Sequence, residues 1–129
     1  MLAAQLTLPY AFASHFAPDS LLPALNTYRN AFQPYDQLDR PYVAIGINIT
    51  AADTDAEAHR LATCQQMSFV GMFPGSRELT LPPIDDIETF WSPSEKAQAG
   101  RMLERSIIGS PETVRKGIAA VIAETELTS

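Results

Sequence analysis

One stretch near the amino terminus says most about the architecture: Leu8-Pro9-Tyr10-Ala11-Phe12-Ala13-Ser14-His15-Phe16. Its first six residues are apolar or aromatic without alternation, which is typical of a strand covered on both faces, as in a parallel sheet. Ser14 and His15 follow where such a strand would give way to a loop. In open α/β sheets and in barrels, ligands bind at the carboxyl ends of the strands. We therefore expect a buried strand whose carboxyl end belongs to a binding site.

A helix and a second strand are predicted to follow. Pro18-Asp19-Ser20 indicates a helix start with Ser20 as the N-cap, because Pro23 is tolerated only in the first turn. One helical face is apolar at spacings of four, three and four residues: Leu21, Leu25, Tyr28 and Phe32. From Tyr42 to Thr50, branched apolar residues alternate with small or polar ones, which predicts a strand. Strand, helix and strand in this order predict a parallel, right-handed βαβ unit.

The second half of the chain is predicted to be mainly helical. Thr54-Asp55-Ala56-Glu57 has the pattern of a capping box, and the helix behind it should end near Phe73-Pro74-Gly75. Ser92-Pro93-Ser94-Glu95 is a second capping box with proline at the first helical position, and its helix should run to about Glu104. Residues 74–91 form a long, proline-containing connection of the kind that is usually functional or mobile.

A last helix is predicted to start at Gly109-Ser110-Pro111-Glu112, and its core-facing side comprises Val114, Ile118, Val121 and Ile122. We interpret Ile107-Ile108 as a short apolar link. The sequence thus predicts two strands, no internal repeat and no domain boundary, so that residues 1–129 form one domain. Both flanks of the strand pair would be unpaired, and exposed edges of apolar strands promote association.

Composition and charge exclude several classes of function. A net charge of −6 and a pI near 4.7 argue against binding to nucleic acid or to anionic membranes, both of which favour basic patches. The sequence has no apolar run of about 18 residues and no secretory signal. Its single cysteine, Cys64, excludes an internal disulfide and fits a reducing, cytoplasmic compartment. Hydrophobic residues make up 46% of the chain, which is enough for a packed core.

Residues that could hold a metal are few. Two histidines, His15 and His59, argue against a multi-histidine site, and Cys64 has no second cysteine nearby. An acidic cluster in the long connection is more simply interpreted as a solvated loop than as a metal site: Asp85, Asp86 and Glu88. We assign no metal site. Neither a GxGxxG nor a Walker motif is present, so a Rossmann or P-loop interpretation has no support.

Five segments, in the same order, resemble those of the bacterial luciferase-like, flavin-dependent monooxygenases. They are Leu8–Pro18, Arg40–Asn48, Ala52–Ala58, Phe90–Glu95 and Gly109–Val114. The resemblance covers nearly the whole chain, but the family's barrel is much longer. It implies an α/β fold, a partial TIM (β/α)8 barrel with a βαβ core and C-terminal helices, in which five strands precede this piece and one follows it. We expect a C-terminal fragment, cut at both ends.

The resemblance also implies a function. The family binds reduced flavin mononucleotide (FMN), supplied by a reductase, and uses oxygen to oxidise a small organic substrate such as an aldehyde. It places Ala13, Ser14 and His15 beside the flavin ring, with His15 as a hydrogen-bond donor or a catalytic acid or base. Trp91 would close over the flavin or substrate. The turn at Ser110 would lie on the ligand side, where the free N–H groups of a helix start can bind phosphate.

Each of these residues has a plainer interpretation. His15 could simply hydrogen-bond the backbone at a strand end, Ser110 could be an ordinary N-cap, and Trp91 could pack the loop onto the core. Asn48 and Thr50, on the second strand, could touch a ligand at the barrel mouth or only solvate the end of the strand. The residues alone leave these alternatives open.

The entry to the first strand departs from the family pattern. Residues 2–6 have the look of a last helical turn, and Thr7 stands where the family usually has glycine. A helix end often needs the left-handed backbone conformation at this place, which costs a β-branched residue roughly 1 kcal/mol or more.

Three functions remain open at the level of sequence. The chain could be a flavin-dependent monooxygenase, with impaired activity as an isolated fragment because most phosphate contacts of the family come from earlier strands. It could be a non-catalytic remnant that forms a homo-oligomer or a segment-swapped dimer. It could also be a half-barrel that complements another chain carrying the missing strands. We expect flavin and a small organic substrate as ligands of an active protein, and neither nucleic acid nor membrane as a partner.

Overall fold

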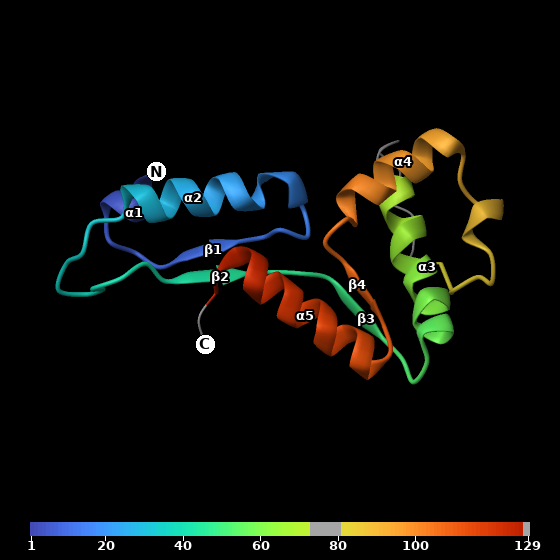
Figure 1. The fold of residues 1–129 in the computed structure, drawn as a ribbon. Coiled ribbons are helices and arrows are strands. Elements are labelled where there is room, and N and C mark those ends of the chain that lie inside the picture. Colours follow the sequence, from blue (N-terminus) through green and yellow to red (C-terminus); the bar gives the residue numbers. More distant parts are fainter. Residues whose placement is uncertain (73–80, 128–129) are drawn as a thin grey trace.

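The computed structural model describes residues 1–72 and 81–127, in which short parallel strands alternate with helices. Figure 1 shows an elongated arrangement, with α2 beside β1 and β2 at one end, α3 and α4 at the other, and α5 between them. The elements in chain order are α1 (Leu2–Gln5), β1 (Tyr10–Phe12), the 3-10 turn η1 (Pro18–Ser20), α2 (Leu21–Ala31), β2 (Val43–Ile45), β3 (Ile49–Ala51), α3 (Asp55–Met72), the 3-10 turn η2 (Ile87–Thr89), α4 (Pro93–Met102), β4 (Ile107–Gly109) and α5 (Pro111–Thr125).

The first strand, helix and second strand form the parallel unit that the sequence predicts. Tyr10 pairs with Val43 and Phe12 pairs with Ile45 in parallel register. Helix α2 covers one face of this pair, where the ring of Tyr28 stacks on that of Tyr10 with the centroids 5.2 Å apart. The buried residues of α2 are those that the helical spacing predicts: Leu21, Leu25 and Tyr28.

The opposite face of the β1–β2 pair is exposed, so the prediction of a strand buried on both faces is wrong. Because side chains alternate along a strand, Ala11, Ala13 and Ala44 point away from α2, and all three are exposed. An apolar run makes a strand suitable for burial on both faces, but burial also requires a second layer of structure packed on the other face. Within the described residues, α2 is the layer that packs on this pair. Strand pairing is also confined to Tyr10–Phe12 of the predicted stretch 8–16.

The predicted second strand is divided into β2 and β3, and the sequence analysis did not predict strand β4. Gly46-Ile47-Asn48 separates β2 from β3. Ile107-Ile108-Gly109 is not a link but strand β4, which pairs in parallel with Ile49–Ala51. Three apolar residues give too short a pattern to identify a strand, and their pairing partner is distant in sequence. Tertiary packing holds this strand in place, because a Cβ atom at Gly117 of α5 would lie only 2.8 Å from the side chain of Ile107.

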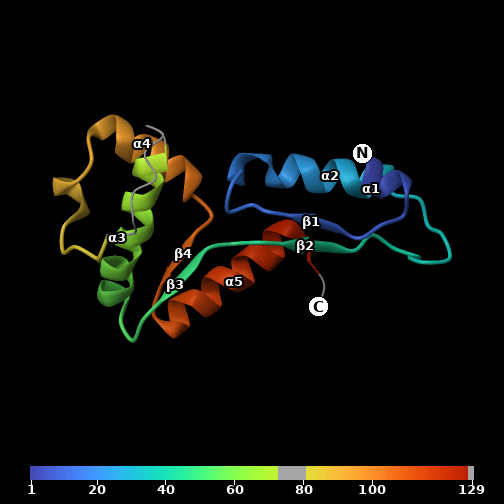
Figure 2. The ribbon, with the colours of Figure 1, turned by 180° about the vertical axis from the view of Figure 1, so that it is seen from behind.

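Strands β1 and β4 lie end to end along one edge of the segment 43–51 (Figures 1 and 2). The N–H of Gly46 donates to the carbonyl of Phe12, and the N–H of Ile107 donates to the carbonyl of Asn48, both at 2.9 Å. In extended backbone, the polar groups of every second residue point to the same edge. The backbone groups of Gly46 and Asn48 therefore point to the edge that β1 and β4 occupy. In the part of the chain that the structure describes, no strand borders the other edge.

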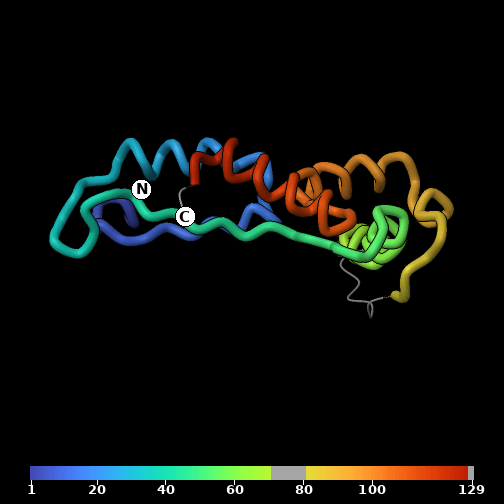
Figure 3. The backbone as a smooth tube through the Cα atoms, turned by 60° about the horizontal axis from the view of Figure 1, so that its bottom comes forward, coloured from blue at the N-terminus to red at the C-terminus, as the bar shows by residue number. Residues whose placement is uncertain are grey.

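Two helices pack on the C-terminal strand pair. Helices α3 and α5 both contact β3 and β4, and Figure 3 shows α5 on the same side of the strand trace as α2. Nη2 of Arg29 in α2 donates to the carbonyl of Thr125 in α5 at 2.6 Å, which ties these two helices together. An apolar cluster joins α3 to α4, and we call it the α3–α4 cluster: Phe69, Val70 and Ala99, with Trp91, Met102 and Leu103 packed against them. No described helix has the length and apolar character needed to cross a membrane.

Most predicted helix caps are confirmed. Ser92 makes the complete capping box at the start of α4, and Ser110 and Thr54 each accept a hydrogen bond from a backbone N–H in the first turn of their helices. Ser20 makes no side-chain cap bond, so its predicted role is wrong. The 3-10 turn Pro18–Ser20 runs directly into α2 and holds Ser20 in a helical backbone conformation, which is unsuited to an N-cap.

The predicted helix ends are less accurate. Helix α4 ends at Met102, two residues before the predicted end at Glu104. Helix α3 is described as far as Met72, and its predicted end at residues 73–75 lies outside the described residues.

Thr7 has the left-handed backbone that its position predicts. Its φ is 55°, and the residue is buried. Its hydroxyl Oγ1 donates to the carbonyl of Gln33 at 2.9 Å, which links the end of α1 to the loop after α2. We infer that this hydrogen bond, worth about 1 kcal/mol, offsets the backbone cost of a similar size.

Candidate functional site

The residues that follow β1 are held by hydrogen bonds to the backbone of one glycine, Gly46. The hydroxyl of Ser14 and the N–H of His15 both donate to the carbonyl of Gly46, the latter at 3.2 Å. Ser14 is fully buried. Its hydroxyl is engaged with the backbone of Gly46, and its predicted contact with a cofactor stays a prediction.

The imidazole of His15 lies over Gly46. A Cβ atom at Gly46 would approach Nδ1 of His15 to 2.9 Å and the Cα of Ala13 to 4.0 Å, so only glycine leaves room for this ring. Because Gly46 is two residues after Ala44, the space above it belongs to the exposed face of β1–β2. His15 and Ala13 thus border that open face together, and their predicted contact with a flavin stays a prediction.

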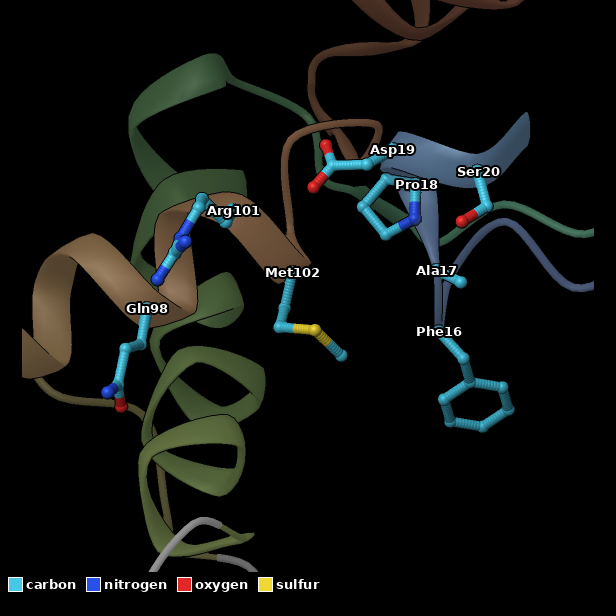
Figure 4. A pocket seen from close by; sticks show the side chains of 8 residues that line it. All are labelled: Phe16, Ala17, Pro18, Asp19, Ser20, Gln98, Arg101 and Met102. Atoms are coloured by element: carbon cyan, nitrogen blue, oxygen red, sulfur yellow. The ribbon is translucent and has the colours of Figure 1, made fainter. Parts of the chain in front are cut away.

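A cavity of about 340 Å³ opens directly after His15, between the loop that follows β1 and the last turn of α4 (Figure 4). Its apolar lining includes Phe16 and Met102, and its polar lining includes Asp19 and Arg101. The full set is Phe16, Ala17, Pro18, Asp19, Ser20, Gln98, Arg101 and Met102. This size and mixture suit a small organic molecule.

Arg105 fixes one wall of this cavity. Its Nε donates to the carbonyl of Pro18 at 3.2 Å, while its two terminal nitrogens donate to both carboxylate oxygens of Glu124 at 2.8 and 3.1 Å. The hydrogen bonds with Glu124 raise the pKa of Arg105, and those with Arg105 lower the pKa of Glu124. Arg105 therefore joins the loop after β1 to α5 through a charge-assisted, two-pronged contact.

The helix start at Ser110 is already occupied by an anion of the chain itself. Oδ1 of Asp55 accepts from the N–H of Ser110 at 2.6 Å and from the hydroxyl of Thr113 at 2.8 Å. The backbone N–H of Ser110, followed by the hydroxyl of Thr113, lowers the pKa of Asp55. A phosphate at this place would have to displace the carboxylate. Ser110 acts as an N-cap, and its predicted contact with a cofactor stays a prediction.

Trp91 packs against the α3–α4 cluster, and its Nε1 donates to Glu88 at 3.3 Å. The plainer of the two interpretations, packing of the loop onto a core, accounts for these contacts. Met102 belongs to the same cluster and also lines the cavity, so Trp91 lies one side chain behind that wall. A position of Trp91 over a flavin stays a prediction.

The structure therefore brings together only some of the predicted site residues. Ala13, Ser14 and His15 meet at Gly46. Ser110 lies beyond β4, whose last residue, Gly109, pairs with Ala51, and five residues of extended chain between Gly46 and Ala51 span about 17 Å.

Sequence reasoning missed two residues that shape this site, Gly46 and Arg105. It also missed Asp55 as the partner of Ser110. A glycine inside an apolar strand often marks a close approach, so Gly46 could have been found. Arg105 and Asp55 carried no such signal, because their partners are distant in sequence.

The other candidates are Asn48 and the acidic cluster of the long connection, and their contacts are with the chain itself. The carbonyl of Asn48 pairs with β4, while its buried Nδ2 has no acceptor among the described residues. In the acidic cluster, Asp85 pairs with Arg60 at 2.8 Å and Glu88 pairs with Lys96 at 2.7 Å.

The fold is that of an α/β protein with parallel strands, and its candidate site lies on the exposed face at the carboxyl end of β1. No family model matches the sequence. The chain is 45% identical over 125 residues to a luciferase-like monooxygenase of Escherichia coli K12, covering 97% of this chain and 37% of that protein. It is 42% identical over the same shares to YvbT, an uncharacterized protein of Bacillus subtilis.

A solved structure shows the same likeness. The crystal structure of apo-MsnO8 matches 96% of this chain and 38% of its own chain, with a TM-score of 0.71 and 27% identity. These findings confirm the resemblance to luciferase-like monooxygenases that the sequence motifs indicate. The chain spans little more than a third of the length of the relatives that it matches.

Proposed function

We propose that the chain takes part in an FMN-dependent, luciferase-like oxidation, in which oxygen acts on a small organic substrate and a reductase supplies the reduced flavin. The observation that carries this proposal is the 45% identity to a luciferase-like monooxygenase over nearly the whole chain. The parallel βαβ unit and the TM-score of 0.71 support a further proposal, that the chain forms part of a (β/α)8 barrel.

The strand-end site fits the ring of a flavin better than its phosphate. The exposed face of β1–β2 carries only small side chains beside His15, at Ala11, Ala13 and Ala44, so a flat ring can lie close to the strands. No such fit exists at Ser110, where Asp55 already takes the N–H group. We therefore assign to this chain the contacts with the ring and to other parts of the fold those with the phosphate.

Within this proposal, each residue of the strand end has a separate task. Reduced flavin, when bound, supplies the electrons for the reaction with oxygen. The imidazole of His15 donates a hydrogen bond to the polar edge of the ring or moves a proton there. Ala13 forms the floor beside it. Ser14 and Gly46 keep the imidazole in place, so they are positioning residues rather than catalytic ones.

Titration with FMN, first oxidised and then reduced with dithionite, tests this proposal through the fluorescence of flavin and of Trp91. We expect a Kd below roughly 100 μM, which corresponds to about −5.5 kcal/mol. His15→Ala should weaken binding about tenfold or more. His59→Ala is the matched control, because His59 is exposed on α3. Equal affinities of the two variants, or no binding by the chain alone or together with the missing part of the fold, would contradict the proposal.

A further inference from the structure

The cavity between the loop after β1 and the last turn of α4 lies next to the ring of His15. Phe16 lines this cavity, and the centroid of its ring is 4.2 Å from that of the His15 imidazole. A ligand that contacts the Phe16 ring from inside the cavity is therefore one side chain away from His15. The cavity adjoins the strand-end site but is formed by other residues, so it has room for a second molecule beside the one that His15 contacts.

Two apolar side chains give the cavity a surface for the body of a ligand. Phe16 is 58% exposed, so its ring is open to contact. Figure 4 shows the side chain of Met102 extending from α4 toward the loop that carries Phe16, and a flexible thioether adapts to ligands of different shape. The volume of about 340 Å³ is near the lower end of the range for ligand pockets, which indicates a small molecule.

The carboxylate of Asp19 is the charged group that faces this space. In the view of Figure 4 it is turned toward α4, whereas the side chain of Arg101 runs along α4 away from it. Asp19 takes part in none of the ion pairs among the described residues. The guanidinium of Arg105, which contacts the carbonyl of Pro18, is held by both carboxylate oxygens of Glu124. The negative charge of Asp19 is therefore available to a ligand.

This combination of groups favours a ligand with a cationic head and an apolar body. An ammonium group and a carboxylate form a charge-assisted hydrogen bond, and the face of an aromatic ring attracts a cation. A carboxylate ligand would instead be repelled by Asp19, and a neutral ligand would gain nothing from its charge.

We propose that this cavity is a binding site for a small primary amine, whose ammonium group contacts Asp19 and whose apolar body lies between Phe16 and Met102. The inference concerns binding. It names the chemical class of the small organic substrate, and it rests on the proposed function only for that role.

The probes for this site are hexylamine, 1-hexanol and hexanoate, which share one carbon chain and differ in the charge of the head group. Each is titrated into the full chain without flavin, and binding is followed by the backbone amide NMR signals. We expect hexylamine to bind saturably, to shift the signals of residues 16–20 and 98–102, and to bind about tenfold more tightly than the other two. Because no measurement uses flavin, failure here is distinct from failure of the FMN titration.

Two matched variants test the role of the carboxylate. Asp19→Asn removes the charge and nearly preserves the shape, and Asp36→Asn removes the same charge from an exposed residue outside the cavity. Both positions are exposed, so circular dichroism should show both variants folded. A carboxylate in the first turn of a helix also favours stability, so the measurement is the preference among probes. We expect Asp19→Asn to abolish the preference for hexylamine over 1-hexanol and Asp36→Asn to retain it.

Four results would overturn the inference. They are an absence of saturable binding of hexylamine, an affinity for 1-hexanol equal to that for hexylamine, equal effects of the two variants, and tighter binding of hexanoate. The last result would assign the anchoring role to Arg101 instead of Asp19.

Discussion

At the scale of single residues, Gly46 does most to define the candidate site. Its carbonyl holds Ser14 and His15, and its missing side chain leaves the space that the imidazole fills. Thr7 shows a different compromise, in which a hydrogen bond to Gln33 accompanies a left-handed backbone.

Substitution of Gly46 by alanine should therefore cost stability and move His15. The new Cβ would lie 2.9 Å from Nδ1, and overpacking of this kind costs about 1–3 kcal/mol. Gly100→Ala is the control, because nothing lies within 4 Å of its Cβ position in α4, and alanine in a helix is favoured by about 1 kcal/mol. Urea unfolding should give opposite signs for the two variants, and the imidazole NMR signals of His15 should shift only in Gly46→Ala. A stable Gly46→Ala protein with unshifted signals would refute the placement of the ring.

At the scale of elements, the caps explain where the helices begin. Helix α4 starts at a full capping box, whereas α2 starts by continuation of a 3-10 turn. Strand β4 and the division between β2 and β3 depend instead on contacts between distant segments, such as that of Ile107 with Gly117.

Two serines at helix starts should therefore respond differently to alanine. Ser92→Ala removes a side-chain acceptor from the first turn of α4 and should destabilise the protein by about 1 kcal/mol. Ser20→Ala removes no cap hydrogen bond and should change stability much less. Thermal unfolding of the two variants provides the comparison. If both lose the same stability, the cap assignment at Ser20 or at Ser92 is wrong.

At the scale of the whole molecule, ion pairs and hydrogen bonds join segments that are distant in sequence. Arg105 connects the loop after β1 with α5 through Glu124, and Asp55 connects the start of α3 with that of α5. Both carboxylates have their pKa lowered below ordinary values, which are 3.8 for Asp55 and 4.5 for Glu124.

The sign of this shift predicts a loss of stability in acid. A carboxyl group with a lowered pKa in the folded protein stabilises it fully above the ordinary pKa, and this stabilisation disappears as pH falls through the lower, folded value. Stability should thus fall below a pH of about 4. In Asp55→Asn and Glu124→Gln, part of this dependence should be absent, as urea unfolding at a series of pH values would show. Glu112 offers a control, because it pairs with Lys116 on the exposed side of α5. Glu112→Gln should leave the dependence of stability on pH almost unchanged. Equal slopes in the wild-type protein and the three variants would contradict the proposed role of the contacts made by Asp55 and Glu124.

The sequence by itself determined the features that depend on local chemistry. Helical spacing gave the buried side of α2, and capping patterns gave the starts of α4 and α5. One apolar stretch gave the parallel strand Tyr10–Phe12, which is followed by Ser14 and His15. The tertiary structure alone decided which faces are covered, because burial depends on what other segments supply. For that reason an apolar strand has an open face, Asp55 rather than a ligand occupies the helix start at Ser110, and Trp91 packs against the α3–α4 cluster. Contacts between segments distant in sequence leave no periodic pattern, so β4 and the link through Arg105 could be found only in three dimensions.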